Sequence, residues 1–83
     1  MKIQAEVSLY PLRKPTLTEW IHPFVEHLRQ NDLEVETGAM SSTVSGECED
    51  LFRALGEAYE KAAQGGDMVL TVKITNACLW NAG

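Results

Sequence analysis

Hydroxyl side chains clustered around Ser42 are the residues of this chain best suited to chemistry. The segment Met40-Ser41-Ser42-Thr43-Val44-Ser45-Gly46 alternates as a β-strand does, which places Met40, Ser42 and Val44 on one face. Ser42 therefore shares a face with two apolar residues. A hydroxyl buried without a partner costs about 1–3 kcal/mol. Either nearby backbone or a ligand must supply the hydrogen bond, and the residues alone leave both explanations open.

Further polar and aromatic residues are expected close to Ser42. Thr37 should point the same way as Ser42 across a hairpin, while Ser41 and Thr43 should point to the other face. An apolar cleft beside them would be lined by aromatic side chains, for which the candidates are Tyr10, Trp20, Phe24 and Trp80. Flat heterocycles are usually held in an apolar slot by a few placed polar groups. The cluster is therefore one candidate for a small-molecule site.

Neither a catalytic nor a metal-binding pattern is evident in the sequence. His22 and His27 are five residues apart, so they do not stack on one helical face. Cys48 and Cys78 lack metal-ligand spacing, and reduced thiols in a cytoplasmic protein are the simplest explanation for both. We therefore expect no enzyme activity, no catalytic residue, no metal ion and no cofactor.

Composition limits the remaining function classes. The 83 residues are expected to form one domain, residues 1–83, with a thin core, because small domains bury only about 60% of their unfolded surface. A net charge of −5 argues against nucleic acid as a partner. No apolar run approaches the roughly 18–20 residues of a membrane span, and no signal segment is recognised. We expect a cytoplasmic protein without membrane insertion that gains further burial by self-association.

Hydrophobic periodicity predicts six elements in the order β-α-β-β-α-β. Alternation marks the strands, the 3.6-residue period marks the helices, and Pro or Gly marks the breaks between them. Thr16 and Glu19 have the capping-box spacing for the first helix, and Pro23 should kink that helix or reset its start. Gly38 and Ala39 should form the hairpin turn. The predicted strands cover residues 3–10, 33–37, 40–45 and 68–75, and the predicted helices cover residues 16–30 and 47–63.

This order indicates an α+β, ferredoxin-like fold, in which a four-stranded antiparallel sheet carries both helices on one face. The other face would be polar but not heavily charged. That composition favours a sheet-to-sheet interface between copies of the chain over plain exposure to solvent. The residues expected on this open face are Gln4, Glu6, Ser8, Tyr10, Ser41, Thr43, Thr71, Lys73 and Thr75.

Three segments of the chain stand out together: Val7-Ser8-Leu9-Tyr10-Pro11-Leu12, Ser41-Ser42-Thr43-Val44-Ser45-Gly46 leading into Leu51-Phe52, and Leu70-Thr71-Val72-Lys73-Ile74-Thr75-Asn76-Ala77-Cys78. They resemble the YkoF-type thiamine- and hydroxymethylpyrimidine-binding proteins and, more loosely, the small single-domain thiamine-binding proteins. The similarity extends from about Ile3 to Cys78. It implies a ferredoxin-like fold and a dimer or tetramer built by packing sheets. It also implies a cytoplasmic protein that binds thiamine or hydroxymethylpyrimidine without transforming it.

The resemblance also points to ligand-binding residues. Ser42 stands where related sequences carry Ser or Thr, ahead of the glycine that matches Gly46. Tyr10 and Thr71 match the YkoF type, and either Glu6 or Glu36 would suit the cationic thiazolium of thiamine. Together, the hydroxyl cluster and the resemblance give an expected ligand-binding set of Ser42, Ser41, Thr37, Tyr10, Trp20, Thr71 and Glu36.

The role implied by the resemblance is uptake, buffering or salvage of thiamine. One alternative is a regulatory module that binds another small metabolite, such as an amino acid, at a subunit interface. A purely structural oligomerisation domain is a second alternative. The fold does not decide among them, because ferredoxin-like domains host many functions.

Overall fold

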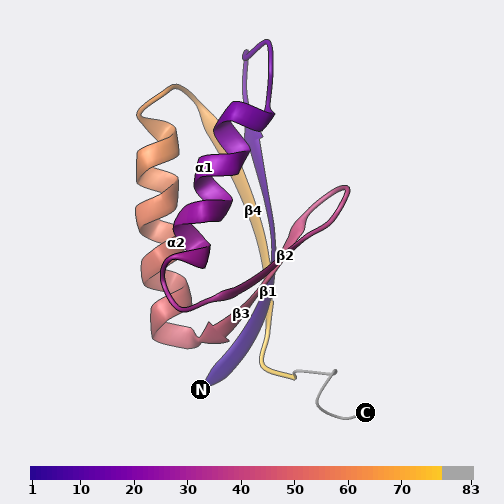
Figure 1. The fold of residues 1–83 in the computed structure, drawn as a ribbon, viewed down its shortest axis with the longest axis vertical. Helices are drawn as coiled ribbons and strands as arrows, with labels where there is room; N and C mark the ends of the chain where they lie inside the picture. The colour runs from indigo at the N-terminus through magenta and orange to yellow at the C-terminus, as the bar shows by residue number, and fades with distance from the viewer. Residues whose placement is uncertain (78–83) are drawn as a thin grey trace.

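The computed structural model describes residues 1–77, so the expectations for Cys78 and Trp80 lie outside the described residues. The elements follow in the predicted order (Figure 1). They are β1 (Lys2–Pro11), α1 (Thr18–Arg29), β2 (Glu34–Thr37), β3 (Ser42–Glu47), α2 (Cys48–Ala63) and β4 (Met68–Thr75). The α+β, ferredoxin-like fold is confirmed.

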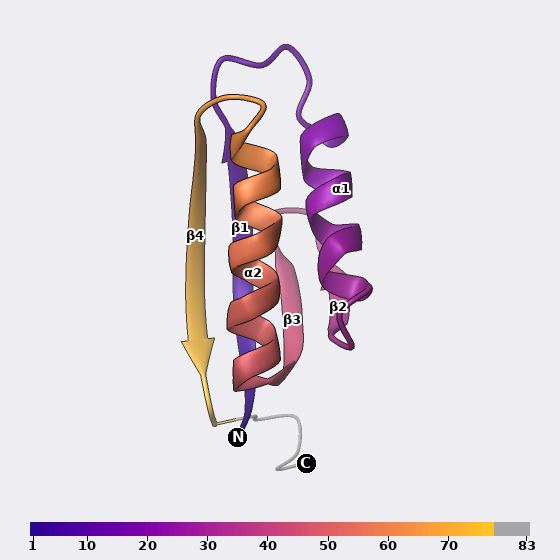
Figure 2. The same cartoon turned by 90° about the vertical axis from the view of Figure 1, so that its left-hand side faces the viewer.

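The four strands form one antiparallel sheet in the order β2-β3-β1-β4. Figure 1 shows this sheet nearly edge-on, with both helices on the same face, and Figure 2 shows α1 and α2 lying side by side across it. No element within residues 1–77 covers the opposite face, which we call the open face. This layout follows from the alternation along β1, where Ile3, Ala5, Val7 and Leu9 are buried toward the helices.

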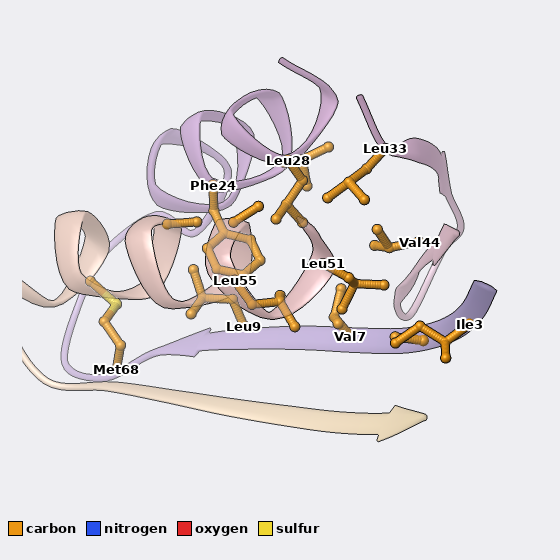
Figure 3. Close-up of a cluster of buried hydrophobic side chains, with 14 residues drawn as sticks. Ile3, Val7, Leu9, Phe24, Leu28, Leu33, Val44, Leu51, Leu55 and Met68 are labelled. Carbon is orange, nitrogen blue, oxygen red and sulfur yellow. The ribbon is translucent and has the colours of Figure 1, made fainter. Parts of the chain in front are cut away.

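The hydrophobic core lies between the sheet and the two helices (Figure 3). Leu28 of α1, Val44 of β3 and Leu51 of α2 are fully buried there, so the sheet and both helices contribute to its centre. In α2, Leu51, Leu55 and Ala58 recur at the helical period and are all buried. Leu17, which precedes α1, is exposed.

The first helix begins at Thr18, later than the sequence predicted. Leu17 occupies the N-cap position without a side-chain cap, and its carbonyl accepts hydrogen bonds from the backbone N–H groups of Trp20 and Ile21 at 3.0 Å. The predicted capping box starting at Thr16 is therefore wrong, because the first turn closes after that residue. The helix also runs through Pro23 without restarting.

The β2–β3 hairpin has a longer turn than the two residues predicted. The turn takes up residues 38–41, and the Gly38 N–H donates to the Ser41 carbonyl at 2.8 Å across it. β3 consequently starts at Ser42 and runs to Glu47. Met40 lies in the turn with 88% of its surface exposed, so the prediction that it shares a buried face with Ser42 and Val44 is wrong. The other two residues of that face are buried as expected.

Neither of the two helices within residues 1–77 is long and apolar enough to cross a membrane.

Candidate ligand-binding site

A cleft opens where β1 runs past the end of β3. β1 pairs with β3 only from Lys2 to Val7, whereas it pairs with β4 from Gln4 to Pro11. The last residues of β1, 8–11, therefore have a neighbouring strand on one side only. The first half of α1 and the β2–β3 turn enclose the other side, which leaves a cleft of about 410 Å³. We call it the hairpin cleft, and its lining is Val7, Ser8, Leu9, Tyr10, Leu17, Ile21, Phe24, Val25, Thr37, Gly38, Ala39, Met40, Ser41 and Ser42.

Ser42 is the buried hydroxyl of this cleft. It is 8% exposed, and it pairs with Thr37 of β2 on one side and with Val7 of β1 on the other. Both hydroxyl residues lie on the helix side of the sheet, as the alternation predicts. The Ser42 hydroxyl makes no hydrogen bond to any other residue within 1–77. The backbone partner that would have given Ser42 a purely structural role is therefore absent from this part of the chain.

Two more of the expected ligand-binding residues line the same cleft. Ser41 is half-buried in the turn, and Tyr10 is exposed near the end of β1. Tyr10 belongs to the open face by alternation, but the β1 edge beside it has no β3 partner, so its side chain also reaches the cleft. The structure thus brings together Ser42, Thr37, Ser41 and Tyr10.

Trp20 lies elsewhere. It lines a separate pocket of about 200 Å³ between α1 and α2. The Lys14 ammonium sits 4.4 Å from the centroid of the Trp20 ring and also donates to the Gly65 carbonyl. The Trp20 ring packs directly against Gly65 as well. These contacts give Trp20 a part in joining α1 to the loop after α2, away from the hairpin cleft.

Thr71 and Glu36 are also outside the hairpin cleft. Thr71 of β4 pairs with Ser8 of β1, and Glu36 of β2 pairs with Thr43 of β3. Both Thr71 and Glu36 therefore lie on the open face. Strand alternation separates them from Ser42 by the thickness of the sheet.

The sequence reasoning missed several residues of the lining, above all Ser8 and Met40. The Ser8 hydroxyl donates to the Met40 carbonyl at 3.4 Å, which ties the β2–β3 turn to the unpaired edge of β1. Leu17, just before α1, and Ile21, in the first turn of α1, also line the cleft. The difference in length between β1 and β3 was the available signal, because a longer central strand leaves such an edge free.

The described lining of the cleft has no charged side chain. Its polar side chains are the hydroxyls of Ser8, Tyr10, Thr37, Ser41 and Ser42, and most of the remainder is apolar. Such a lining suits a neutral, flat ring with hydrogen-bonding atoms on its edge. Residues 1–77 hold no group of three or more His, Cys, Asp or Glu side chains placed to bind a metal ion.

Two solved structures of low sequence identity share the fold. The crystal structure of SP2199 from Streptococcus pneumoniae superposes with a TM-score of 0.86 at 23% identity, covering 96% of this chain and 91% of that one. The crystal structure of TM0486 from Thermotoga maritima, a protein assigned provisionally to thiamine biosynthesis or salvage, gives a TM-score of 0.80 at 24% identity. It covers 89% of this chain and 82% of that one. Both likenesses concern the fold alone.

A nearer relative and a family profile identify the family. The UPF0045 protein MJ1052 of Methanocaldococcus jannaschii is 31% identical over 71 residues, which cover 84% of this chain and 71% of that protein. Its crystal structure superposes with a TM-score of 0.84 at 30% identity, covering 90% of this chain and 79% of that one. The sequence profile described as thiamine-binding protein matches residues 5–76. The chain therefore belongs to the thiamine-binding protein family.

Proposed function

We propose that the chain binds thiamine or hydroxymethylpyrimidine in the hairpin cleft and releases it unchanged. The observation that carries this proposal is the Ser42 hydroxyl, which lines the cleft, is nine-tenths buried and has no hydrogen-bond partner within residues 1–77. Among the described residues the fully buried side-chain atom without a partner is Trp20 Nε1, so the Ser42 hydroxyl is open to the cleft, where a ligand heteroatom can bond it in place of water. Membership of the thiamine-binding protein family supports the choice of ligand.

The pyrimidine ring is the part of the ligand that best fits the lining. Its ring nitrogens accept hydrogen bonds and its exocyclic amine donates them, and the hydroxyls of Ser42 and Thr37 can do either. Leu9, Ile21 and Phe24 supply apolar walls for the faces of a flat ring. The free edge of β1 adds backbone groups that a ring edge can bond.

The charge of the cleft and of the chain should favour binding of free thiamine over binding of thiamine diphosphate. A diphosphate needs cationic side chains or a cluster of backbone donors, and the described lining of the cleft has no Lys or Arg. The whole chain carries a net charge of −5, which attracts the thiazolium cation of thiamine and repels phosphate. We therefore propose that the unphosphorylated forms are the ligands.

The same lining supports a role without catalysis. No His, Cys, Asp, Glu or Lys among residues 1–77 lines the hairpin cleft, so the cleft offers no nucleophile or general base beyond its hydroxyls. We propose that residues 1–83 act as one cytoplasmic domain that buffers thiamine or hydroxymethylpyrimidine or delivers it during uptake or salvage. The Thermotoga maritima relative assigned provisionally to thiamine biosynthesis or salvage agrees with that role.

We also propose that two copies pack through their open faces. One row across the open face runs from Glu36 through Thr43 and Glu6 to Lys73, from an acidic edge strand to a basic one. A two-fold axis parallel to the strands would set Lys73 of each copy over the acidic edge of the other. The charge pattern of the row is therefore self-complementary in a face-to-face dimer.

Thermal unfolding in the presence of candidate ligands tests the proposed function. Thiamine or hydroxymethylpyrimidine at 100 times its dissociation constant should add about 2.7 kcal/mol to the free energy of unfolding. The thiazole fragment alone should add much less, because it lacks the ring that the cleft suits. A shift with an amino acid and none with the two proposed ligands would favour a regulatory module instead. No shift with any of these compounds would contradict the proposal.

A further inference from the structure

The backbone of Leu9 in β1 directs its N–H and C=O groups toward the β3 side of the sheet. Along a central strand, successive residues direct these groups alternately to the two neighbouring strands. The Leu12 N–H donates to the Asp67 carbonyl at 3.0 Å, so with the observed register the even-numbered residues of β1 bond β4. The Cys48 N–H donates to the Met1 carbonyl at 2.9 Å, so the odd-numbered residues bond β3. Leu9 belongs to this second set.

No residue of β3 stands opposite Leu9. The register between the two strands pairs Val7 with Ser42, which is the first residue of β3. Continuing that register would pair Leu9 with Met40, but Met40 lies in the turn. The Met40 carbonyl accepts the Ser8 hydroxyl at 3.4 Å, and no backbone hydrogen bond joins Met40 to Leu9. The Leu9 N–H and C=O groups therefore have no partner within residues 1–77.

An unpaired backbone donor and acceptor are unusual at a residue as buried as Leu9, which is 6% exposed. Leu9 lines the hairpin cleft, so a ligand in the cleft can reach both groups. The Leu9 side chain points toward the helices (Figure 3), and the backbone groups lie along the edge of the strand. A ring bonded to them would lie in the plane of the sheet, with one face toward Ile21 and Phe24 of α1.

This backbone pair matches one edge of an aminopyrimidine. Leu9 offers its donor and its acceptor side by side, as a residue does to its partner in an antiparallel ladder. A pyrimidine nitrogen next to an exocyclic amine offers the complementary acceptor and donor. The thiazolium ring of thiamine offers neither group, because its nitrogen is quaternary and it carries no N–H. The edge of β1 therefore distinguishes the two halves of thiamine.

Resting on the proposed function, we propose that the Leu9 N–H and C=O groups select the ligand by pairing with the ring nitrogen and the exocyclic amine of its pyrimidine. The ring then takes the place that Met40 would hold if β3 continued. Ser42, at the beginning of β3, bonds a second position of the same ring. The thiazolium of thiamine stays outside this pairing, so the selection acts equally on thiamine and on hydroxymethylpyrimidine.

Ligand analogues test the selection. Hydroxymethylpyrimidine without its exocyclic amine would leave the buried Leu9 carbonyl unpaired, so its dissociation constant should be roughly 5- to 150-fold higher. The control is the thiamine analogue with a pyridinium ring in place of the thiazolium. It keeps the aminopyrimidine and should bind within about twofold of thiamine in calorimetric titrations. Equal affinity for hydroxymethylpyrimidine with and without the amine would overturn the assignment.

A backbone substitution tests whether Leu9 is the residue responsible. The full 83-residue chain can be assembled from two synthetic segments joined at Cys48, with the amide between Ser8 and Leu9 replaced by an ester. The ester removes the Leu9 N–H and keeps every side chain. Affinity for hydroxymethylpyrimidine should fall at least about fivefold, because the ring nitrogen loses its donor.

The matched control replaces the amide between Thr71 and Val72 by an ester. The Val72 N–H also faces an edge without a neighbouring strand among the described residues, but it lies outside the hairpin cleft. Ser8 and Thr71 are paired across β1 and β4, so the two esters alter carbonyls of the same residue pair. The control ester should therefore bind as the wild type does, and circular dichroism checks that both proteins are folded.

Amide hydrogen exchange gives a reading on the unmodified protein. Bound hydroxymethylpyrimidine should slow exchange of the Leu9 amide at least about tenfold and leave the Val72 amide unchanged. If hydroxymethylpyrimidine binds the Leu9 ester as tightly as the wild type, the assignment fails while the proposed function stands. If neither thiamine nor hydroxymethylpyrimidine binds the wild-type protein, the proposed function and the assignment fail together.

Discussion

Thr37 and Ser42 face each other across the β2–β3 hairpin, on the side of the sheet that carries the helices. Residues paired directly across antiparallel strands have Cβ atoms about 4.5–5.5 Å apart. Two hydroxyls at that spacing can bond neighbouring atoms on one edge of a heterocycle. The pair also lies where β1 loses its β3 neighbour, so hydroxyls and free backbone meet at one end of the sheet.

Removing the Thr37 hydroxyl should weaken binding of hydroxymethylpyrimidine. Thr37→Val keeps the shape of the side chain, and the loss of one hydrogen bond worth about 0.5–1.5 kcal/mol corresponds to an affinity roughly 2- to 12-fold lower. Isothermal titration calorimetry measures the change. Thr43→Val is the matched control, because it makes the same substitution on the open face of the same hairpin. Equal losses in the two variants would exclude a specific contact at Thr37.

Thiamine diphosphate should bind at least about tenfold more weakly than thiamine, a difference of about 1.4 kcal/mol. The physical reason is that the described lining of the hairpin cleft has hydroxyl and apolar groups but no cationic side chain, while the chain as a whole is acidic. Competition titrations at two salt concentrations would measure both affinities. Tighter binding of the diphosphate would show that a cationic site outside this lining determines the ligand.

Trp20→Ala should lower stability and spare ligand binding. The ring packs between Lys14 and Gly65 at the helix pair, so its removal should cost about 1–3 kcal/mol, less than the 3–5 kcal/mol typical of a fully buried tryptophan. Urea denaturation would report this loss. Calorimetry on the folded variant should give a dissociation constant within about twofold of wild type, since an uninvolved residue carries well under 1 kcal/mol of binding energy. A large drop in affinity would return Trp20 to the binding site.

Reversing one charge on the open face should weaken face-to-face packing. Lys73→Glu places a carboxylate opposite the acidic edge of the partner, and like charges across an interface oppose association. Combining it with Glu36→Lys should restore the wild-type mass in sedimentation experiments. Neither residue makes an ion pair within residues 1–77, so the exchange should leave the fold intact. Failure of the double variant to recover would contradict the proposed orientation.

The sequence predicted those features of the fold that depend on the two-residue alternation of a β-strand. Alternation along β1 and β4 fixed their helix-facing residues, and the same parity predicted that Thr37 and Ser42 would share a side. The turn was harder, because Gly38 gave no sign that Ser41 would accept its N–H and lengthen the loop. Met40 moved from the predicted strand to the mouth of the cleft for that reason.

The candidate site was predictable only where strand parity controls it. The separation of Trp20 from the hairpin cleft could not be predicted, because the direction of its side chain depends on how α1 is rotated against α2, which no local pattern encodes. Thr71 and Glu36 lie apart from Ser42 because their strands turn them to the open face, away from the cleft. The full extent of the cleft depends on the lengths of β1 and β3 relative to each other, which is a tertiary property.

Calorimetric titration of Ser42→Ala with hydroxymethylpyrimidine and thiamine is the most direct test of the central claim. The control is Ser45→Ala, which removes the same hydroxyl from the open side of the same strand. The account predicts that Ser42→Ala lowers affinity for both ligands by roughly 5- to 150-fold, or about 1–3 kcal/mol, while Ser45→Ala binds as the wild type does. A folded Ser42→Ala variant with wild-type affinity would contradict the account.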